Sequence, residues 1–92
     1  METVDVYQSE INQWIPMEYI GTMQYIGKDD PLSFTDGKVY TIVRDKNRDL
    51  KVVDDTDEDY LYNLNAPNDL GGQFFYLDDP YGILARYIER AR

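Results

Sequence analysis

Lys38-Val39-Tyr40-Thr41-Ile42-Val43-Arg44 is a run in which β-branched and aromatic residues dominate, and it lies at the centre of the predicted fold. Residues of these types favour a strand, and Gly37 punctuates its start. The polar run 45–49 contains an Asn, which tolerates left-handed backbone geometry, and it predicts a turn. Residues 50–54 then return as a second strand, so the pattern predicts a β-hairpin in the middle of the chain.

Further strands are expected on both sides of this hairpin. Asp59–Tyr62 follows an acidic turn and completes a three-stranded meander, while Thr22–Ile26 lies upstream and Gln73–Leu77 downstream. Loops rich in turn-forming residues, 27–36 and 65–72, separate them. Five short strands at this spacing predict a mainly β fold, a small and partly open barrel.

The chain is expected to end in a helix. Asp79 is a capping residue and Pro80 suits the first helical position, although Gly82 lowers helix propensity. The apolar residues that follow have helical spacing: Tyr81, Leu84, Ile88 and Ala91. We expect a helix from about Pro80 to Ala91 that either lies on an open end of the barrel or meets the same helix of a second copy in a homodimer.

Two interpretations fit the first 20 residues. Ser9 could cap a short helix through Trp14 that Pro16 ends, or Val4 and Val6 could belong to an edge strand. A chain of 92 residues fits a single domain.

Within that domain we expect three parts. These are an N-terminal extension at 1–21, the barrel at 22–78 and a C-terminal helical part at 79–92.

The net charge restricts the class of partner. Eighteen acidic against nine basic residues give −9, which repels phosphate backbones and anionic lipid. No apolar run approaches the roughly 18 to 20 residues of a membrane span, and Met1–Asp5 carries acids where a secretion signal carries positive charge. The sequence therefore predicts a cytoplasmic protein with no direct contact to nucleic acid or membrane.

The charge is also unevenly distributed. Residues 1–36 carry a net −6, residues 37–53 a net +3, residues 54–79 a net −8 without any base, and the tail a net +2. The most crowded acids lie in one turn: Asp54, Asp55, Asp57, Glu58 and Asp59. They could pair with the basic stretch across a hairpin, or they could form an exposed acidic face that a basic partner recognises.

The absence of cysteine and histidine excludes disulfides, thiol nucleophiles, Ser-His-Asp triads and zinc sites built on thiolate or imidazole. Asp45, Asn47 and Asp49 match the first three ligand positions of an EF-hand loop. Leu50 stands where that loop needs Gly, however, and Thr56 where it needs a bidentate Glu. We therefore expect no metal and no cofactor.

Acids close together have two further uses. A looser divalent-cation site among residues 54–59 would need the fold to bring its carboxylates together, and glycosidase chemistry would need a substrate cleft around two carboxylates of different pKa. A chain of this length rarely supplies such a cleft, so we expect a protein that is not an enzyme.

Aromatic residues provide a second kind of contact. Tyr60 and Tyr62 would project from one face of their strand and Leu61 from the other. The tyrosines then form an exposed strip if Leu61 faces the core, or one of them caps the core edge. Trp14 is expected to pack on the barrel or to serve as an interface anchor.

Three motifs carry a family resemblance: Gly37-Lys38-Val39-Tyr40, then Val52-Val53-Asp54-Asp55, then Glu58-Asp59-Tyr60-Leu61-Tyr62. Together they resemble short bacterial and phage proteins with a Src-homology-3-like barrel, over about residues 25–64. The resemblance implies a fold and no catalytic residue. Because the chain has its only Trp at position 14, we do not expect it to recognise polyproline.

These observations predict a non-enzymatic acidic module that binds a protein with a basic surface. The expected binding residues are Asp54, Asp55, Asp57, Glu58, Asp59, Tyr60 and Tyr62. The alternative is an inhibitor of phage or mobile-element type that mimics nucleic acid and blocks a DNA-binding protein. A regular row of exposed acids would favour mimicry, whereas acids neutralised by Lys51 and its neighbours would favour the binding module.

Overall fold

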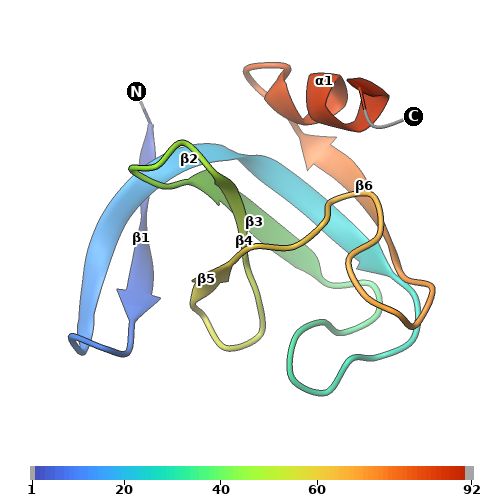
Figure 1. Cartoon of the computed structure of the whole chain (residues 1–92), viewed down its shortest axis with the longest axis horizontal. Helices are drawn as coiled ribbons and strands as arrows, with labels where there is room; N and C mark the ends of the chain where they lie inside the picture. The colour runs from blue at the N-terminus through green and yellow to red at the C-terminus, as the bar shows by residue number, and fades with distance from the viewer. Residues whose placement is uncertain (1, 91–92) are drawn as a thin grey trace.

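The computed structural model describes residues 2–90, and for residues 89 and 90 the backbone alone. It shows one antiparallel sheet followed by a helix (Figure 1). The elements are β1 (Thr3–Gln8), β2 (Gln13–Ile26), β3 (Val39–Arg44), β4 (Leu50–Val53), β5 (Asp59–Tyr60), β6 (Gln73–Asp78) and α1 (Ile83–Arg90).

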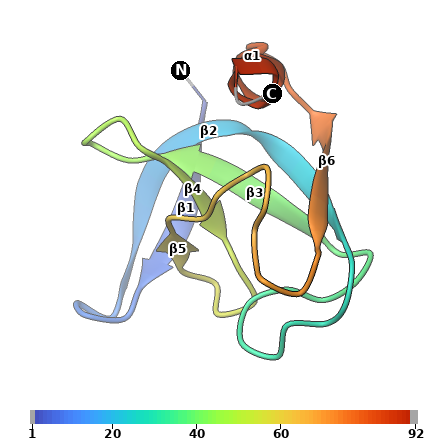
Figure 2. The ribbon, with the colours of Figure 1, turned by 45° about the vertical axis from the view of Figure 1, so that its right-hand side comes forward.

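The sheet is curled and open on one side. Its strands run in the order β1-β2-β3-β4-β5, and β6 joins β2 as an additional neighbour. Figure 2 shows how the curl brings β5 and β6 to face each other, yet no pairing connects these two strands in the described part of the chain. The predicted mainly β, partly open barrel with a C-terminal helix is confirmed, with β1 as a sixth strand.

The central meander has the predicted order. Val43 lies opposite Lys51 in the β3–β4 hairpin, and β5 is shorter than the predicted strand 59–62. In the hairpin turn the left-handed residue is Arg48, with φ of 68°, and not the expected Asn47. The reason is Asp45, whose Oδ1 accepts the backbone N–H groups of Asn47 and Asp49 at 2.9 Å each and so fixes the turn one residue later.

The first 20 residues form strands. The interpretation of residues 9–14 as a helix is wrong, because residues 9–12 make the tight turn of a β1–β2 hairpin in which Asn12 has a φ of 49°. The edge strand containing Val4 and Val6 is confirmed as β1. Pro16 lies in the part of β2 that pairs on one side only, where a strand tolerates proline. Residues 3–8 and 13–21 are therefore part of the sheet, whereas we expected an extension.

The long strand β2 contributes to two cores. A register shift between Tyr19 and Gly21 inserts one extra residue opposite β3, and such a bulge changes which side chains face a given side of the sheet. Met17 belongs to a small cluster with Val6 and Val43. Ile20, the extra residue of the bulge, belongs to the main core.

The main core lies on the other face of the sheet and is rich in aromatic rings. Phe34, from the loop after β2, packs against Tyr25, Tyr40 and Phe74, with ring centroids 5.1 to 5.2 Å apart. Leu84 and Ile88 of α1 close this core. Burial of apolar surface on both faces of β3 and β4 thus holds the curl in place.

The helix begins later than predicted. Gly82 has a φ of 66°, which interrupts the chain before the helix, and α1 starts at Ile83 instead of Pro80. The cap is nevertheless Asp79, whose two carboxylate oxygens accept the N–H groups of Leu84 and Ala85 at 3.0 Å each. The expected end of the helix at Ala91 lies outside the described residues.

The helix packs against the barrel, which is one of the two arrangements that we expected. A methyl group at Gly21 of β2 would come within 2.8 Å of Leu84 Cδ1 and within 2.2 Å of the backbone oxygen of Asp78, so glycine allows the helix and β6 to approach β2 closely. The homodimer through this helix stays a prediction.

Replacing Leu84 with Ala should lower the free energy of unfolding by about 2 to 5 kcal/mol, because it removes a fully buried side chain between helix and sheet. Tyr87, exposed on the same helix, is the matched position: Tyr87→Ala should change stability far less. Urea denaturation followed by circular dichroism measures both. Equal losses would show that α1 does not dock through Leu84.

Candidate functional site

The acidic turn between β4 and β5 folds around Asp54. This residue is only 4% exposed. Its Oδ1 accepts the backbone N–H of Thr56 at 2.9 Å and the hydroxyl of Thr56 at 2.5 Å, and its Oδ2 accepts the hydroxyl of Tyr62 at 2.6 Å. Asp54 was predicted as part of a binding surface, but the structure places it inside the turn as an acceptor.

Asp55 is bonded to three side chains from a different part of the chain. Its Oδ1 accepts from Lys38 Nζ and from the Tyr40 hydroxyl, at 2.8 Å each, and its Oδ2 accepts from the Thr35 hydroxyl at 3.0 Å. Partial burial on its own would raise the pKa of Asp55, but these hydrogen bonds outweigh it and lower the pKa. Asp55 therefore stays ionised and connects the turn to β3.

The other end of the turn is tied to the β1–β2 hairpin. Gln8 Nε2 donates to Asp59 Oδ1 at 2.7 Å, and the backbone N–H of Ser9 donates to Glu58 Oε1 at 2.7 Å. The bond from Ser9 lowers the pKa of Glu58. Side chains thus join the end of β1 to the turn before β5.

Lys51 stands between two carboxylates on the same face of the sheet. Its Nζ lies 3.2 Å from Asp45 Oδ2 and 3.6 Å from Asp59 Oδ2. Burial favours the neutral amine, but the two acids outweigh it and raise the pKa of Lys51. The expected pairing of the acidic turn with the basic stretch 37–53 is present at Asp59 and, through Lys38, at Asp55.

The predicted strip of exposed tyrosines does not form. Leu61 is 65% exposed and does not face the core. Tyr62 packs its ring 4.7 Å from that of Phe34 and donates its hydroxyl to Asp54, so it caps the core edge, which was the other expectation. Tyr60 alone remains on the surface, 46% exposed.

Trp14 lies on the β1–β2 hairpin, away from both cores. It is exposed and its ring contacts Tyr7, with centroids 5.4 Å apart. It does not pack on the barrel, so of its two expected roles that of an interface anchor stays a prediction.

The loop from Gly27 to Gly37 adds acids to the turn. The backbone N–H of Asp55 donates to the oxygen of Ser33 at 2.9 Å, which fixes the loop beside the turn. Figure 1 shows both segments at the same end of the barrel, opposite the β3–β4 turn and α1. We call this the acidic end, and its carboxylates belong to Asp29, Asp30, Asp36, Asp55, Asp57 and Glu58.

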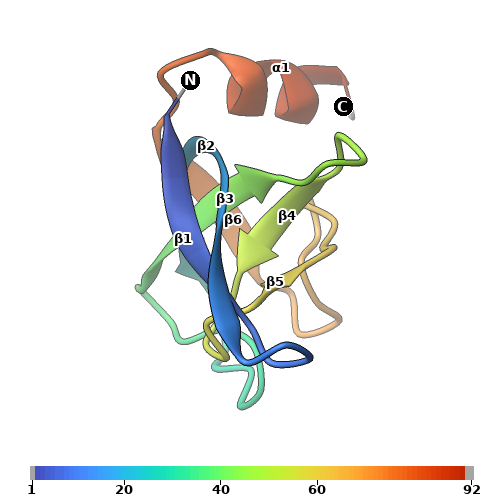
Figure 3. The same ribbon diagram turned by 90° about the vertical axis from the view of Figure 1, so that its left-hand side faces the viewer.

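The opposite end differs in charge. The β3–β4 turn carries Lys46 and Arg48 together with Asp45 and Asp49, so its net charge is zero, and Figure 3 shows it projecting at the end of the barrel where α1 lies. The excess of acids at the acidic end is therefore not matched by this turn at the opposite end. Counting along the chain had missed Asp29, Asp30 and Asp36, because their proximity to the turn depends on how the loop folds.

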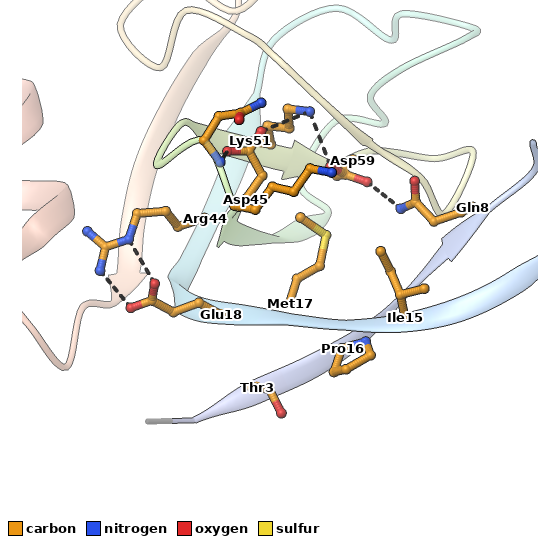
Figure 4. A pocket seen from close by; sticks show the side chains of 12 residues that line it. Thr3, Gln8, Ile15, Pro16, Met17, Glu18, Arg44, Asp45, Lys51 and Asp59 are labelled. Carbon is orange, nitrogen blue, oxygen red and sulfur yellow. Dashed lines mark hydrogen bonds and ion pairs between the residues drawn. The ribbon is translucent and has the colours of Figure 1, made fainter.

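An open groove of about 640 Å³ lies between the β1–β2 hairpin and the β3–β4 turn (Figure 4). Ile15 and Met17 are among the apolar residues that line it. Arg44 donates to Glu18 from two of its guanidinium nitrogens, Nε to Oε1 at 2.8 Å and Nη2 to Oε2 at 2.6 Å, and these bonds lower the pKa of Glu18. Sequence reasoning missed the groove, because separate segments supply its residues and no motif connects them.

Among the residues whose side chains the structure describes, 2–88, no three acids come together in a way that could hold a metal ion. Within residues 2–90, no helix has the length and apolar character needed to cross a membrane.

Comparison of the chain with protein-family models, with curated proteins and with solved structures gave no match. The geometry of the site is therefore the basis for a functional proposal.

Replacing Asp54 with Asn should destabilise the protein by about 1 to 3 kcal/mol, because a buried acceptor of three hydrogen bonds becomes a partial donor. Asp57 provides the matched control in the same turn. It is exposed with a φ of 69°, which Asn tolerates, so Asp57→Asn should change stability by less than about 0.5 kcal/mol. Thermal melting distinguishes the two, and similar melting temperatures would contradict the structural role of Asp54.

Stability should also fall at alkaline pH. Burial and the neighbouring Asp54 raise the pKa of Tyr62 to about 12, and burial and Asp78 raise the pKa of Tyr19 to about 12. In the unfolded chain both tyrosines ionise near pH 10. Their contribution to the free energy of unfolding is therefore complete below about pH 10 and is lost as the pH rises toward 12. Urea denaturation measures the free energy of unfolding across this pH range, and this free energy should fall less steeply with pH in Tyr62→Phe than in the original chain. The same slope in both proteins would contradict the raised pKa of Tyr62.

Proposed function

We propose that the protein is a non-enzymatic module that binds a basic protein through its acidic end. The observation that carries the proposal is the hydrogen-bonded acidic turn, in which inward bonds of Asp54 and Asp55 leave Asp57 exposed and Glu58 half-buried at the surface. A surface that is already ordered loses little conformational entropy on binding. The expected binding residues thus divide into a supporting group and a contacting group.

The supporting group consists of Asp54, Asp55, Asp59 and Tyr62, whose side chains are bonded within the protein. The contacting group consists of Asp57 and Tyr60, which are exposed, and of Glu58, which is half-buried and accepts the Ser9 N–H through one carboxylate oxygen. Their position beside the acidic loop 27–37 suits a partner with several lysines or arginines, because clustered charge accelerates association with a surface of opposite sign.

The ion pairs support the binding module over the mimic of nucleic acid. Such a mimic needs carboxylates free to take the place of phosphates. Asp55 and Asp59 instead lie within 2.8 Å of Lys38 and 3.6 Å of Lys51 respectively.

Affinity capture from a cytoplasmic extract tests this proposal. Asp57→Asn with Glu58→Gln removes two charges from the contacting group, and Gln at position 58 keeps an oxygen for the Ser9 N–H. The matched control, Glu2→Gln with Asp5→Asn, removes the same charge from exposed positions at β1. We expect the original chain and the control to capture the same basic protein, released by high salt, and the 57/58 variant to lose most of it.

Equal capture by both variants would overturn the proposal. Capture of a DNA-binding protein that a DNA duplex displaces would favour the mimic instead. Mass spectrometry of the bound fraction identifies the partner in either case.

A further inference from the structure

Strand β6 has an unpaired edge. It pairs with β2 alone, from Asp78 opposite Thr22 to Gln73 opposite Ile26. Among the described residues, no backbone hydrogen bond connects its outer edge to another segment. Figure 2 shows β6 at the margin of the sheet, with α1 above it. The edge therefore presents free N–H and C=O groups toward the open side of the barrel.

The residues of β6 make this edge unusually apolar. Phe74 to Leu77 form an uninterrupted apolar run, and only Phe74 is buried. Phe75, Tyr76 and Leu77 are between 46% and 58% exposed. Natural edge strands are commonly protected by Lys, Pro or inward charges. Gln73–Asp78 contains neither Lys nor Pro, so its edge is open to another strand.

The apolar surface continues across the neighbouring strands. Gln24 of β2 lies opposite both Val39 of β3 and Phe75 of β6, which places the three side chains in one row on the outer face. Val39 and Phe75 are both exposed. A strand added to β6 would extend this row and cover part of it.

The charge of the segments beside the outer edge of β6 indicates which charge a segment bound there should have. Residues 59–79 comprise β5, the loop after it, β6 and Asp79, and they contain four acids and no base. Among the described residues only one of these acids, Asp59, forms an ion pair. A second copy of the chain would bring the same acidic segment and a net charge of −9 to this edge. Charge complementarity therefore selects a basic segment and opposes self-pairing.

We propose that an extended segment of a partner protein, apolar in its middle and with Lys or Arg at its ends, adds to the outer edge of β6 as a further strand. Main-chain hydrogen bonds supply affinity in this mode, and alternate side chains supply specificity. The inference rests on the proposed function in requiring a basic protein partner, but it assigns a different contact surface.

A synthetic peptide tests the inference. The probe is Lys-Lys-Val-Thr-Val-Ile-Val-Lys-Lys, and its binding to the isotope-labelled chain is followed by NMR through backbone amide shifts. We expect the largest shifts at Gln73–Asp78. Methylation of the central amide nitrogens of the peptide should weaken binding by about tenfold or more, because it removes the donors that pair with β6. Replacing the terminal lysines with Glu should abolish binding.

Two variants of the protein separate this surface from the acidic end. Leu77→Lys places a charge on β6, and Leu32→Lys makes the same change at another exposed leucine, in the loop of the acidic end. Binding lost in Leu77→Lys and kept in Leu32→Lys supports strand addition. The reverse pattern, with shifts confined to the acidic end, would overturn strand addition and leave the proposed function standing.

Three other results would also overturn the inference. They are no binding of the lysine peptide, equal binding of its methylated form, and dimerisation of the chain through β6 in sedimentation experiments without peptide.

Discussion

The structure depends on one long strand that pairs on both sides. β2 bonds to β1, β3 and β6, and its bulge between Tyr19 and Gly21 directs Met17 to one face of the sheet and Met23 to the other. Without this change of face, the chain could not bury apolar side chains on both sides of β3 and β4. The curl that follows sets the positions of the acidic turn, the groove and the open edge.

Carboxylates have two different uses in this protein. Asp54 and Asp55 accept hydrogen bonds from hydroxyl, amide and ammonium groups of the protein, and these bonds fix the β4–β5 turn against the loop 27–37. Asp57 and Glu58 then lie on a surface whose shape is already determined. Net charge by itself does not reveal this division, because a charged residue that is part of the framework counts the same as one that is available to a partner.

Local patterns predicted the β3–β4–β5 meander, β6 and the cap at Asp79, because alternation of side chains and capping chemistry act over a few residues. Features that need distant segments were not predictable. The inward position of Asp54 depends on Tyr62, and the pairing of Asp55 depends on Lys38 and Tyr40. The groove depends on the curl of β2, which no short motif encodes.

We propose that the chain works by contact, through its acidic end and the outer edge of β6. Hydrogen–deuterium exchange of the chain, alone and bound to its captured partner, distinguishes these surfaces from the rest of the protein. We expect slower exchange on binding in residues 54–59 and 73–78. Protection confined to the β3–β4 turn at 45–49, or to the groove around Lys51, would contradict it.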